Sequence, residues 1–221
     1  ELLAQTSITI DARDWFDIKE PIERHIFVDL PPKARKQYDE MQKELFTWIQ
    51  DHPLEAFSAG VKSLKCLQMA SGSVKISEDK WLPVHDEKIE ALKSVVEETN
   101  GAPLLVAYQF RADMERILKA FPRAQTLEKD SKRKEREFRE GKIPMLVVHP
   151  ASAGHGLDLQ HNCNILVDYS SGFNKEYDEQ VIERIGPTRQ FQIGKDVPVY
   201  RYRIIARGTV EQTAVLPSLK N

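Results

Sequence analysis

An apolar run leads directly into a segment of small residues in Ile143-Pro-Met-Leu-Val-Val-His-Pro-Ala-Ser-Ala-Gly-His-Gly-Leu-Asp-Leu-Gln160. The run Ile143–Val148 has the aliphatic and β-branched content of a strand that is buried on both faces. The small side chains after it let backbone amides approach a phosphate closely, and the hydroxyl of Ser152 can donate to it. A plain tight turn would explain the glycines, but it explains the whole string less well. Because open α/β sheets bind ligands at the carboxyl ends of their strands, we predict a phosphate-facing loop here.

The same alternation of short apolar runs and helical patterns continues on both sides of this segment. Short apolar strands that alternate with helices predict an α/β fold, in which helices cover both faces of a parallel sheet. The expected strands are 103–107, 143–148, 164–168 and 197–205, and the expected helices lie near 85–100, 114–121, 129–140 and 174–185.

The N-terminal part of the chain has a different character. Its strand-like run His25–Leu30 is followed by a helical pattern that opens at Pro32, because proline is tolerated at a first helical position. A second helical pattern covers 61–69, and the mixed glycine, serine, proline and charge of 71–84 predict a connection. We therefore expect a mainly helical N-terminal extension over 1–84 and an α/β lobe over 85–221.

Composition excludes several classes of protein. Of the 221 residues, 41% are hydrophobic and 30% are charged, which is typical of a folded globular chain. The 32 basic and 34 acidic residues nearly cancel, so a nucleic-acid partner would have to be bound through a local patch. No apolar run is long enough to cross a membrane. Cys66 and Cys163 lack the spacing of a disulfide framework, so a reducing cytoplasm is expected.

No complete nucleotide-binding loop or metal site is predicted. A phosphate loop needs Ser or Thr after Gly-Lys, but Gly141-Lys142 is followed by Ile and Gly194-Lys195 by Asp. The histidines 149, 155 and 161 are evenly spaced, but a strand, a turn and a loop would scatter their side chains. The acidic pairs do not follow apolar strands, and we interpret them as solvated helix residues. These pairs are Asp39-Glu40, Asp86-Glu87 and Asp178-Glu179.

A second polar segment is Gln180-Val-Ile-Glu-Arg184-Ile-Gly-Pro-Thr-Arg189-Gln190. Its two arginines lie at the end of a predicted helix and can present guanidinium groups to a polyphosphate. Taken alone, they are more simply explained as surface ion-pair formers.

In this order, the two segments resemble motifs V and VI of superfamily-two helicases, and most closely those of Swi/Snf-type DNA translocases, including small phage and bacterial members. Ala151–Gln160 is similar to motif V, which usually ends Gly-Leu-Asn-Leu-Gln. Gln180 and Arg184 match the Gln and the first Arg of motif VI. Three further stretches resemble family elements: Leu104–Phe110 (motif IV), Phe138–Pro144 (the Phe-x-x-Gly approach to the motif V strand) and Ile22–Tyr38 (the strand, Leu-Pro-Pro-Lys and helix after the first lobe).

The resemblance implies that this chain is the second RecA-like lobe of a two-lobe, ATP-dependent translocase of double-stranded DNA, in the cytoplasm of a bacterial or phage-infected cell. It implies that Arg184 reaches the γ-phosphate of ATP as an arginine finger. The implied ATP-site residues are Gly154, Gly156, Leu157, Asp158 and Gln180, and the implied DNA contacts are Gln109, Arg111, Lys132, Ser152 and His155.

The resemblance also implies what lies outside this sequence. The first lobe would supply the phosphate loop and the acids that hold Mg²⁺, so ATP and Mg²⁺ would be held only by the complete enzyme. This chain alone is expected to hold no cofactor and to be inactive. We expect it to bind double-stranded DNA and the first lobe, and we expect no contact with a membrane.

Two residues depart from the family pattern. Asp158 replaces the usual Asn and adds a charge near the phosphate-facing turn. Pro187 stands where motif VI has its second Arg, and we expect the turn at Gly186-Pro187 to bring Arg189 into that place. A non-catalytic DNA- or protein-binding module on a RecA-like scaffold is the alternative. Pro187 and the missing first lobe favour this alternative, and the intact motif V string opposes it.

Two segments, 129–142 and 184–207, hold more basic than acidic residues. Such local excesses can contact a phosphate backbone, although a solvated helix explains the first segment equally well. In the second segment Arg201, Arg203 and Arg207 outnumber the acids nearby in sequence, so we expect them to be available to DNA.

Overall fold

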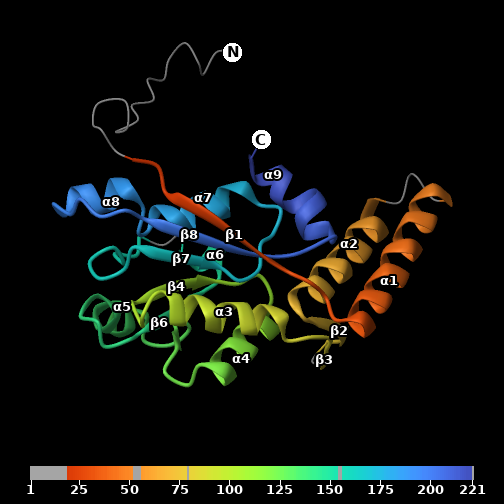
Figure 1. The fold of residues 1–221 in the computed structure, drawn as a ribbon, viewed down its shortest axis with the longest axis horizontal. Helices are drawn as coiled ribbons and strands as arrows, with labels where there is room; N and C mark the ends of the chain where they lie inside the picture. The colour runs from red at the N-terminus through yellow and green to blue at the C-terminus, as the bar shows by residue number, and fades with distance from the viewer. Residues whose placement is uncertain (1–18, 52–55, 79, 154–155, 221) are drawn as a thin grey trace, which may run out of the picture.

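The structure is a computed structural model that describes residues 19–51, 56–78, 80–153 and 156–220 (Figure 1). Within this part of the chain, six strands pair in one sheet in the order β1-β8-β7-β4-β6-β5. All neighbouring strands of this sheet run parallel, which confirms the predicted α/β fold. The strands are β1 (Ile22–Val28), β4 (Leu104–Ala107), β5 (Gln125–Thr126), β6 (Met145–Val148), β7 (Ile165–Asp168) and β8 (Tyr200–Ala206).

Helices cover both faces of this sheet because its central strands are apolar on both sides. Along β4, Leu104 and Val106 belong to the core on one face. Leu105 and Ala107 belong to the core on the other. The first face packs against α3 and α4, and the second against α5 and α7. The helices are α1 (Pro32–Asp51), α2 (Ala56–Ser71), α3 (Glu87–Glu98), α4 (Arg111–Ala120), α5 (Ser131–Arg139), α6 (Pro150–Ala153), α7 (Lys175–Glu183), α8 (Pro187–Gln192), the π-helix η2 (Glu211–Val215) and α9 (Leu216–Lys220).

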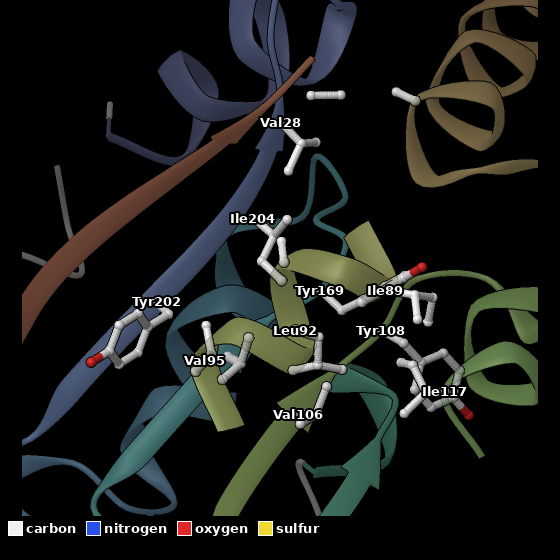
Figure 2. Close-up of a cluster of buried hydrophobic side chains, with 14 of the residues drawn as sticks. Val28, Ile89, Leu92, Val95, Val106, Tyr108, Ile117, Tyr169, Tyr202 and Ile204 are labelled. Atoms are coloured by element: carbon white, nitrogen blue, oxygen red, sulfur yellow. The ribbon is translucent and has the colours of Figure 1, made fainter. Parts of the chain in front are cut away.

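The larger core lies on the α3 and α4 face. Figure 2 shows Leu92 and Val95 of α3 in one cluster with Val106 of β4 and Ile204 of β8. Leu92, Val95 and Val106 are completely buried. Burying an aliphatic side chain of this size contributes about 1.5–3 kcal/mol, so apolar contact alone holds α3 firmly against the sheet.

The edge strand β1 comes from the N-terminal part of the chain. It pairs with β8 over its whole length, from Ile22 opposite Tyr200 to Val28 opposite Ala206. The pair α1 and α2 follows β1 and projects from one end of the molecule, while α8 lies at the opposite end (Figure 1). Backbone hydrogen bonds of the sheet therefore join the N-terminal part of the chain to the lobe.

Most predicted strands and helices are confirmed, with ends shifted by a few residues. The connection predicted at 71–84 is wrong, because this segment forms the antiparallel strands β2 (Ser73–Ser77) and β3 (Lys80–Pro83). Packing from elsewhere stabilises this hairpin: the backbone N of Lys75 donates to Gln68 Oε1 (3.0 Å), and Trp81 lies against Phe110. Contacts with α2 and with the start of α4 thus override the loop-like composition.

Lys88, near the start of α3, is a completely buried cation. Its Nζ donates to the Glu211 carboxylate (2.6 Å) and to the backbone oxygens of Tyr169 (2.9 Å) and Ile204 (2.8 Å). Glu211 also accepts a hydrogen bond from the backbone N of Ala206 (2.9 Å). All three N–H groups of the ammonium are used, and they tie α3 to the ends of β7 and β8 and to η2.

We predict that Lys88→Met lowers the free energy of unfolding by about 3–5 kcal/mol, because it leaves the Glu211 carboxylate buried without its cation. Urea unfolding followed by circular dichroism measures the loss. The double variant Lys88→Met/Glu211→Gln should recover part of it, since the amide is neutral and can still accept from Ala206. A loss below 1 kcal/mol in the single variant would contradict the structural role of the pair.

Candidate functional site

α7 and α8 meet at a corner that holds both predicted arginines. Arg184 directly follows α7, and Arg189 lies within α8, with both residues half-buried. We expected a turn at Gly186-Pro187, but Gly186 is the N-cap residue of α8 and Pro187 is its first helical residue. Proline suits this position because its φ is already helical and the missing N–H has no helical partner there.

The two arginines lie close enough to influence each other. A Cβ on Gly186 would lie 3.0 Å from the backbone oxygen of Ile182, so glycine permits the close approach of α7 and α8. Burial lowers the pKa of Arg184, the positive charge of Arg189 lowers it further, and Glu183 acts in the opposite direction. Because two like charges repel at this corner, a bound polyanion would relieve their repulsion.

Gln180 lies one helical turn before Arg184 on the same side of α7. It is half-buried, and its Nε2 donates to Glu176 Oε1 (2.9 Å), a side chain one turn earlier. The predicted pair Gln180 and Arg184 thus shares one helix face.

Segment 149–163 crosses the lobe from the carboxyl end of β6 to the amino end of β7. It begins with α6, where Ser152 Oγ donates to the backbone oxygen of His149 (2.7 Å). Ser152 is exposed, as a contact to DNA phosphate requires. Gly154 and His155, two further predicted site residues, lie outside the described residues.

The second half of this crossing segment is anchored in the core. Gly156 is exposed and has a φ of +67°, a left-handed conformation that favours glycine. Leu157 and Leu159 are buried in the core beneath α5 and α7. Leu157, predicted at the ATP site, therefore holds the segment in place through apolar contact.

The charge of Asp158 is neutralised within the chain. Its carboxylate pairs with Arg139 (2.9 Å) at the end of α5 and lies 3.4 Å from His161 Nδ1. Its backbone N donates to Glu135 Oε1 (2.8 Å). The carboxylate expected near a phosphate is thus directed toward α5.

The loop after β4 is held by a buried carboxylate that sequence analysis missed. Asp113 is completely buried and accepts hydrogen bonds from Ser170 Oγ and Ser71 Oγ (both 2.7 Å). Asp113 Oδ2, which accepts from Ser170, also accepts from the backbone N of Phe110 (3.2 Å), and Ser170 Oγ accepts from the backbone N of Gln109 (2.8 Å). Burial raises the pKa of Asp113, and these hydrogen bonds oppose the rise. In the sequence, only the position of Asp113 could have indicated this role: it lies in the first turn of α4, where a carboxylate can accept from the backbone of the N-cap residue.

Of the DNA contacts predicted near this loop, Gln109 is the most constrained. Its side chain lies over Gly172, where an added Cβ would stand 2.7 Å from Gln109 Oε1. Arg111 is exposed and pairs with Glu115 (3.0 Å), and Lys132 is exposed on α5. The structure therefore places these three side chains at or near the surface.

A cavity of about 280 Å³ opens at the carboxyl ends of β4, β6 and β7. Because β4 has β6 on one side and β7 on the other, this is the crevice in which open α/β sheets bind ligands. The ring of His149 meets the ring of Tyr108 edge-on at 5.5 Å, and burial lowers the pKa of this histidine. Polar residues that line the cavity include Gln109, His149, Ser170 and Asn174, and its aromatic residues are Phe173 and Tyr177.

The expectation that Arg201 and Arg203 are available to DNA is wrong, whereas Arg207 is exposed. Arg201 and Arg203 are buried and share the carboxylate of Asp178, with contacts of 2.5–2.9 Å. Arg207 pairs with Asp29 (3.0 Å). Asp178 is correspondingly a half-buried ion-pair partner and not a solvated helix acid. The acidic partners of these three arginines lie far from them in the sequence. Counting only the acids nearby in sequence therefore gave a wrong prediction.

In the described part of the chain, no group of His, Cys, Asp and Glu side chains could hold a metal ion. Among the same residues, no helix is long and apolar enough to span a membrane.

Comparison with known proteins shows what this chain is similar to. Residues 87–188 match the helicase conserved C-terminal domain family. These residues are therefore similar to a helicase C-terminal domain, and they include the loop after β4, the crossing segment, α7 and Arg184.

One relative is protein p41 of Acyrthosiphon pisum secondary endosymbiont phage 1, which is 46% identical over 214 residues. The match covers 96% of this chain and 46% of p41, so the chain spans about half the length of this relative.

Solved structures with the same fold include helicase and Snf2-type ATPase lobes. The Sulfolobus solfataricus SWI2/SNF2 ATPase core in complex with dsDNA matches with a TM-score of 0.65 and 18% identity, over 89% of this chain and 43% of that one. The C-terminal part of the Fun30 ATPase domain matches with a TM-score of 0.61 and 14% identity, over 92% of this chain and 91% of that one. The predicted RecA-like fold is thus confirmed.

We predict that Asp158→Asn, which introduces the residue usual in the family, lowers the free energy of unfolding by less than about 1 kcal/mol, because its ion pair is partly exposed. The loss should vanish in 1 M salt, where such pairs are screened. Chemical unfolding at two salt concentrations measures both effects, and Arg139→Ala serves as the control from the other side of the pair. A loss above 2 kcal/mol that persists in salt would show that Asp158 has a further partner.

Proposed function

We propose that this chain is the second motor lobe of an ATP-dependent translocase of double-stranded DNA. The observation that carries this proposal is the close placement of Arg184 and Arg189 where α7 meets α8. The helicase C-terminal domain over 87–188 and the Snf2-type fold support it. A non-catalytic module would have no need for two half-buried guanidinium groups side by side, where burial and the charge of Arg189 lower the pKa of Arg184.

Arg184 and Arg189 are proposed to bind the polyphosphate of ATP held between this lobe and a first lobe. ATP with Mg²⁺ supplies the phosphoryl chemistry when bound, and the acids that hold Mg²⁺ would come from the first lobe. The half-buried site strengthens the attraction of both guanidinium groups for developing negative charge. Gln180, one turn before Arg184, is suited to orient the same ligand. An arginine finger of this kind contributes about 10³–10⁵ in rate.

DNA is proposed to lie along the carboxyl edge of the sheet and to contact the lobe through its backbone. Gln109, Arg111, Lys132, Ser152 and His155 are the proposed contacts, and the Sulfolobus relative was solved in complex with dsDNA. Contacts to phosphate orient a protein but read little sequence, so translocation along any duplex is expected. Closing and opening of the two lobes during each ATP cycle would move the protein along the duplex.

In a two-lobe protein that includes this chain, Arg184→Ala should lower ATP turnover by at least about 10³-fold, because charge in the transition state loses its partner. Arg189→Ala should produce a similar loss if this side chain takes the place of the second finger. Steady-state ATPase assays with DNA measure both.

The matched control for these variants is Arg207→Ala, which removes an exposed guanidinium paired with Asp29 and should leave turnover unchanged. Normal turnover in Arg184→Ala would reject its catalytic role. An unaffected Arg189→Ala enzyme would leave one arginine finger in this lobe.

This chain alone should bind duplex DNA weakly, with an affinity that falls as salt increases, because phosphate neutralisation releases counterions. Fluorescence anisotropy with two duplexes of unrelated sequence at several salt concentrations tests this. The same chain should show no ATP turnover above background. Salt-independent or sequence-selective binding would argue against backbone contact, and DNA-stimulated turnover by the chain alone would argue against its role as a second lobe.

A further inference from the structure

The hairpin of β2 and β3 and one stripe of α4 enclose a cavity of about 240 Å³. On the hairpin, Ser73 lies directly opposite Pro83, and Trp81 shares their face because side chains two positions apart on a strand point the same way. This cavity is separate from the crevice at the carboxyl ends of β4, β6 and β7. Its lining residues on α4 recur three or four apart, as on one face of a helix, and are Ala112, Glu115, Arg116 and Lys119.

A buried hydroxyl forms part of the cavity wall. Ser73 is 3% exposed, and its Oγ has no hydrogen-bond partner among the residues that the structure describes. Leaving a buried hydroxyl without a partner costs free energy, so a ligand that hydrogen-bonds to this group gains affinity. On the α4 side, Ala112 has only a methyl group, which leaves room for such a ligand.

The hairpin also supplies flat apolar surface to the cavity. Trp81 is half-buried and lies against Phe110, with the two ring centres 6.3 Å apart. Pro83, two residues later on the same face, adds the side of its ring. Stacking on aromatic side chains is a general way to bind unpaired nucleotides and tolerates any base. This wall therefore suits a planar ring system such as a nucleobase.

One cation at this cavity is available to an anion. Lys119 is exposed and forms no ion pair within the described part of the chain. Arg116, by contrast, is committed to backbone oxygens and to Asp86 (2.8 Å). The carboxylate of Glu115 is paired with Arg111 (3.0 Å). A matching ligand is planar, hydrogen-bonding and anionic, which is the chemistry of a nucleotide.

We propose that this cavity binds one unpaired nucleotide of DNA, with its base against Trp81 and a phosphate at Lys119. Arg111, a proposed DNA contact, directly precedes Ala112, so the cavity begins where that contact ends. From Arg111 to Lys119 the helix rises by about 12 Å, a span that neighbouring nucleotides of one strand can bridge. This inference rests on the proposed function and names its substrate class, which is duplex DNA with an unpaired stretch such as a gap or a single-stranded tail.

Fluorescence anisotropy on this chain compares a blunt duplex, the same duplex with a short single-stranded tail, and a tail of equal length that lacks bases. The normal tail should raise the affinity about 10-fold, as stacking of a single base does, and the abasic tail should not. Trp81→Ala should abolish this gain, and Trp81→Phe should keep most of it. Leu82→Ala is the matched control, since Leu82 is exposed on the opposite face of β3 and its loss should leave the gain unchanged.

An equal gain from the abasic tail, or a gain that survives in Trp81→Ala, would overturn the inference. Hydroxyl-radical footprinting of the unsubstituted chain gives a second measurement that does not depend on a variant folding. Oxidation of Trp81 should fall when the tailed duplex binds and should not change with the blunt duplex.

The same footprint separates this ligand from others. Equal protection of Trp81 by free dAMP would make a mononucleotide the ligand, and protection only by an acidic peptide that contains tyrosine would make the cavity a protein-docking site. Either result overturns the assignment to DNA. If the chain binds no duplex at all, the proposed function fails, whereas protection of Trp81 by a single-stranded oligonucleotide still decides what the cavity binds.

Discussion

The position of α7 depends on a buried cluster of two aspartates and two arginines. Arg201 donates to Asp168 (2.7 Å) and to Asp178 (2.5 Å), and Arg203 makes two hydrogen bonds with Asp178 (2.8 and 2.9 Å). Burial by itself would raise the pKa of Asp178, but the hydrogen bond from Arg203 and the charges of both arginines hold it below its usual value. Glu23 of β1 lies 3.4 Å from Arg203, so the edge strand joins the same cluster. α7 is thereby fixed to β7, β8 and β1 by charge as well as by apolar contact.

Such a cluster contributes more to orientation than to net stability. Three buried charges and the half-buried Asp178 lose much of their hydration, and apolar residues of equal volume are often as stabilising. Directed hydrogen bonds, however, allow only one register of α7 on the sheet, whereas apolar contacts through Val181 and Ile185 tolerate small rotations. A fixed register matters if Arg184, at the end of this helix, has to meet a phosphate within hydrogen-bond distance.

Sequence analysis could predict what periodicity and local motif encode. The apolar runs predicted β4, β6 and β7. The motifs predicted a C-terminal helicase lobe. Both predictions succeed because a strand and a motif are each made of residues that are neighbours in the sequence. The ion-pair cluster could not be predicted, since Asp168, Asp178 and Arg201 meet only after the sheet has formed. Asp178 was misinterpreted for the same reason: beside Glu179 on an amphipathic pattern, it looks solvated.

The departure at Pro187 is best understood through the helix that it opens. Arg189 lies two positions after Pro187, which on one continuous helix would turn its side chain by about 200° away from the family's second arginine. A new helix axis that begins at Pro187 removes this geometric objection, because the direction of Arg189 is then set by α8 and not by α7. The same change of axis buries Gln190 against the end of the crossing segment. Both features therefore follow from the start of α8 at a proline: position 187 has no arginine, and Gln190 makes its buried hydrogen bonds.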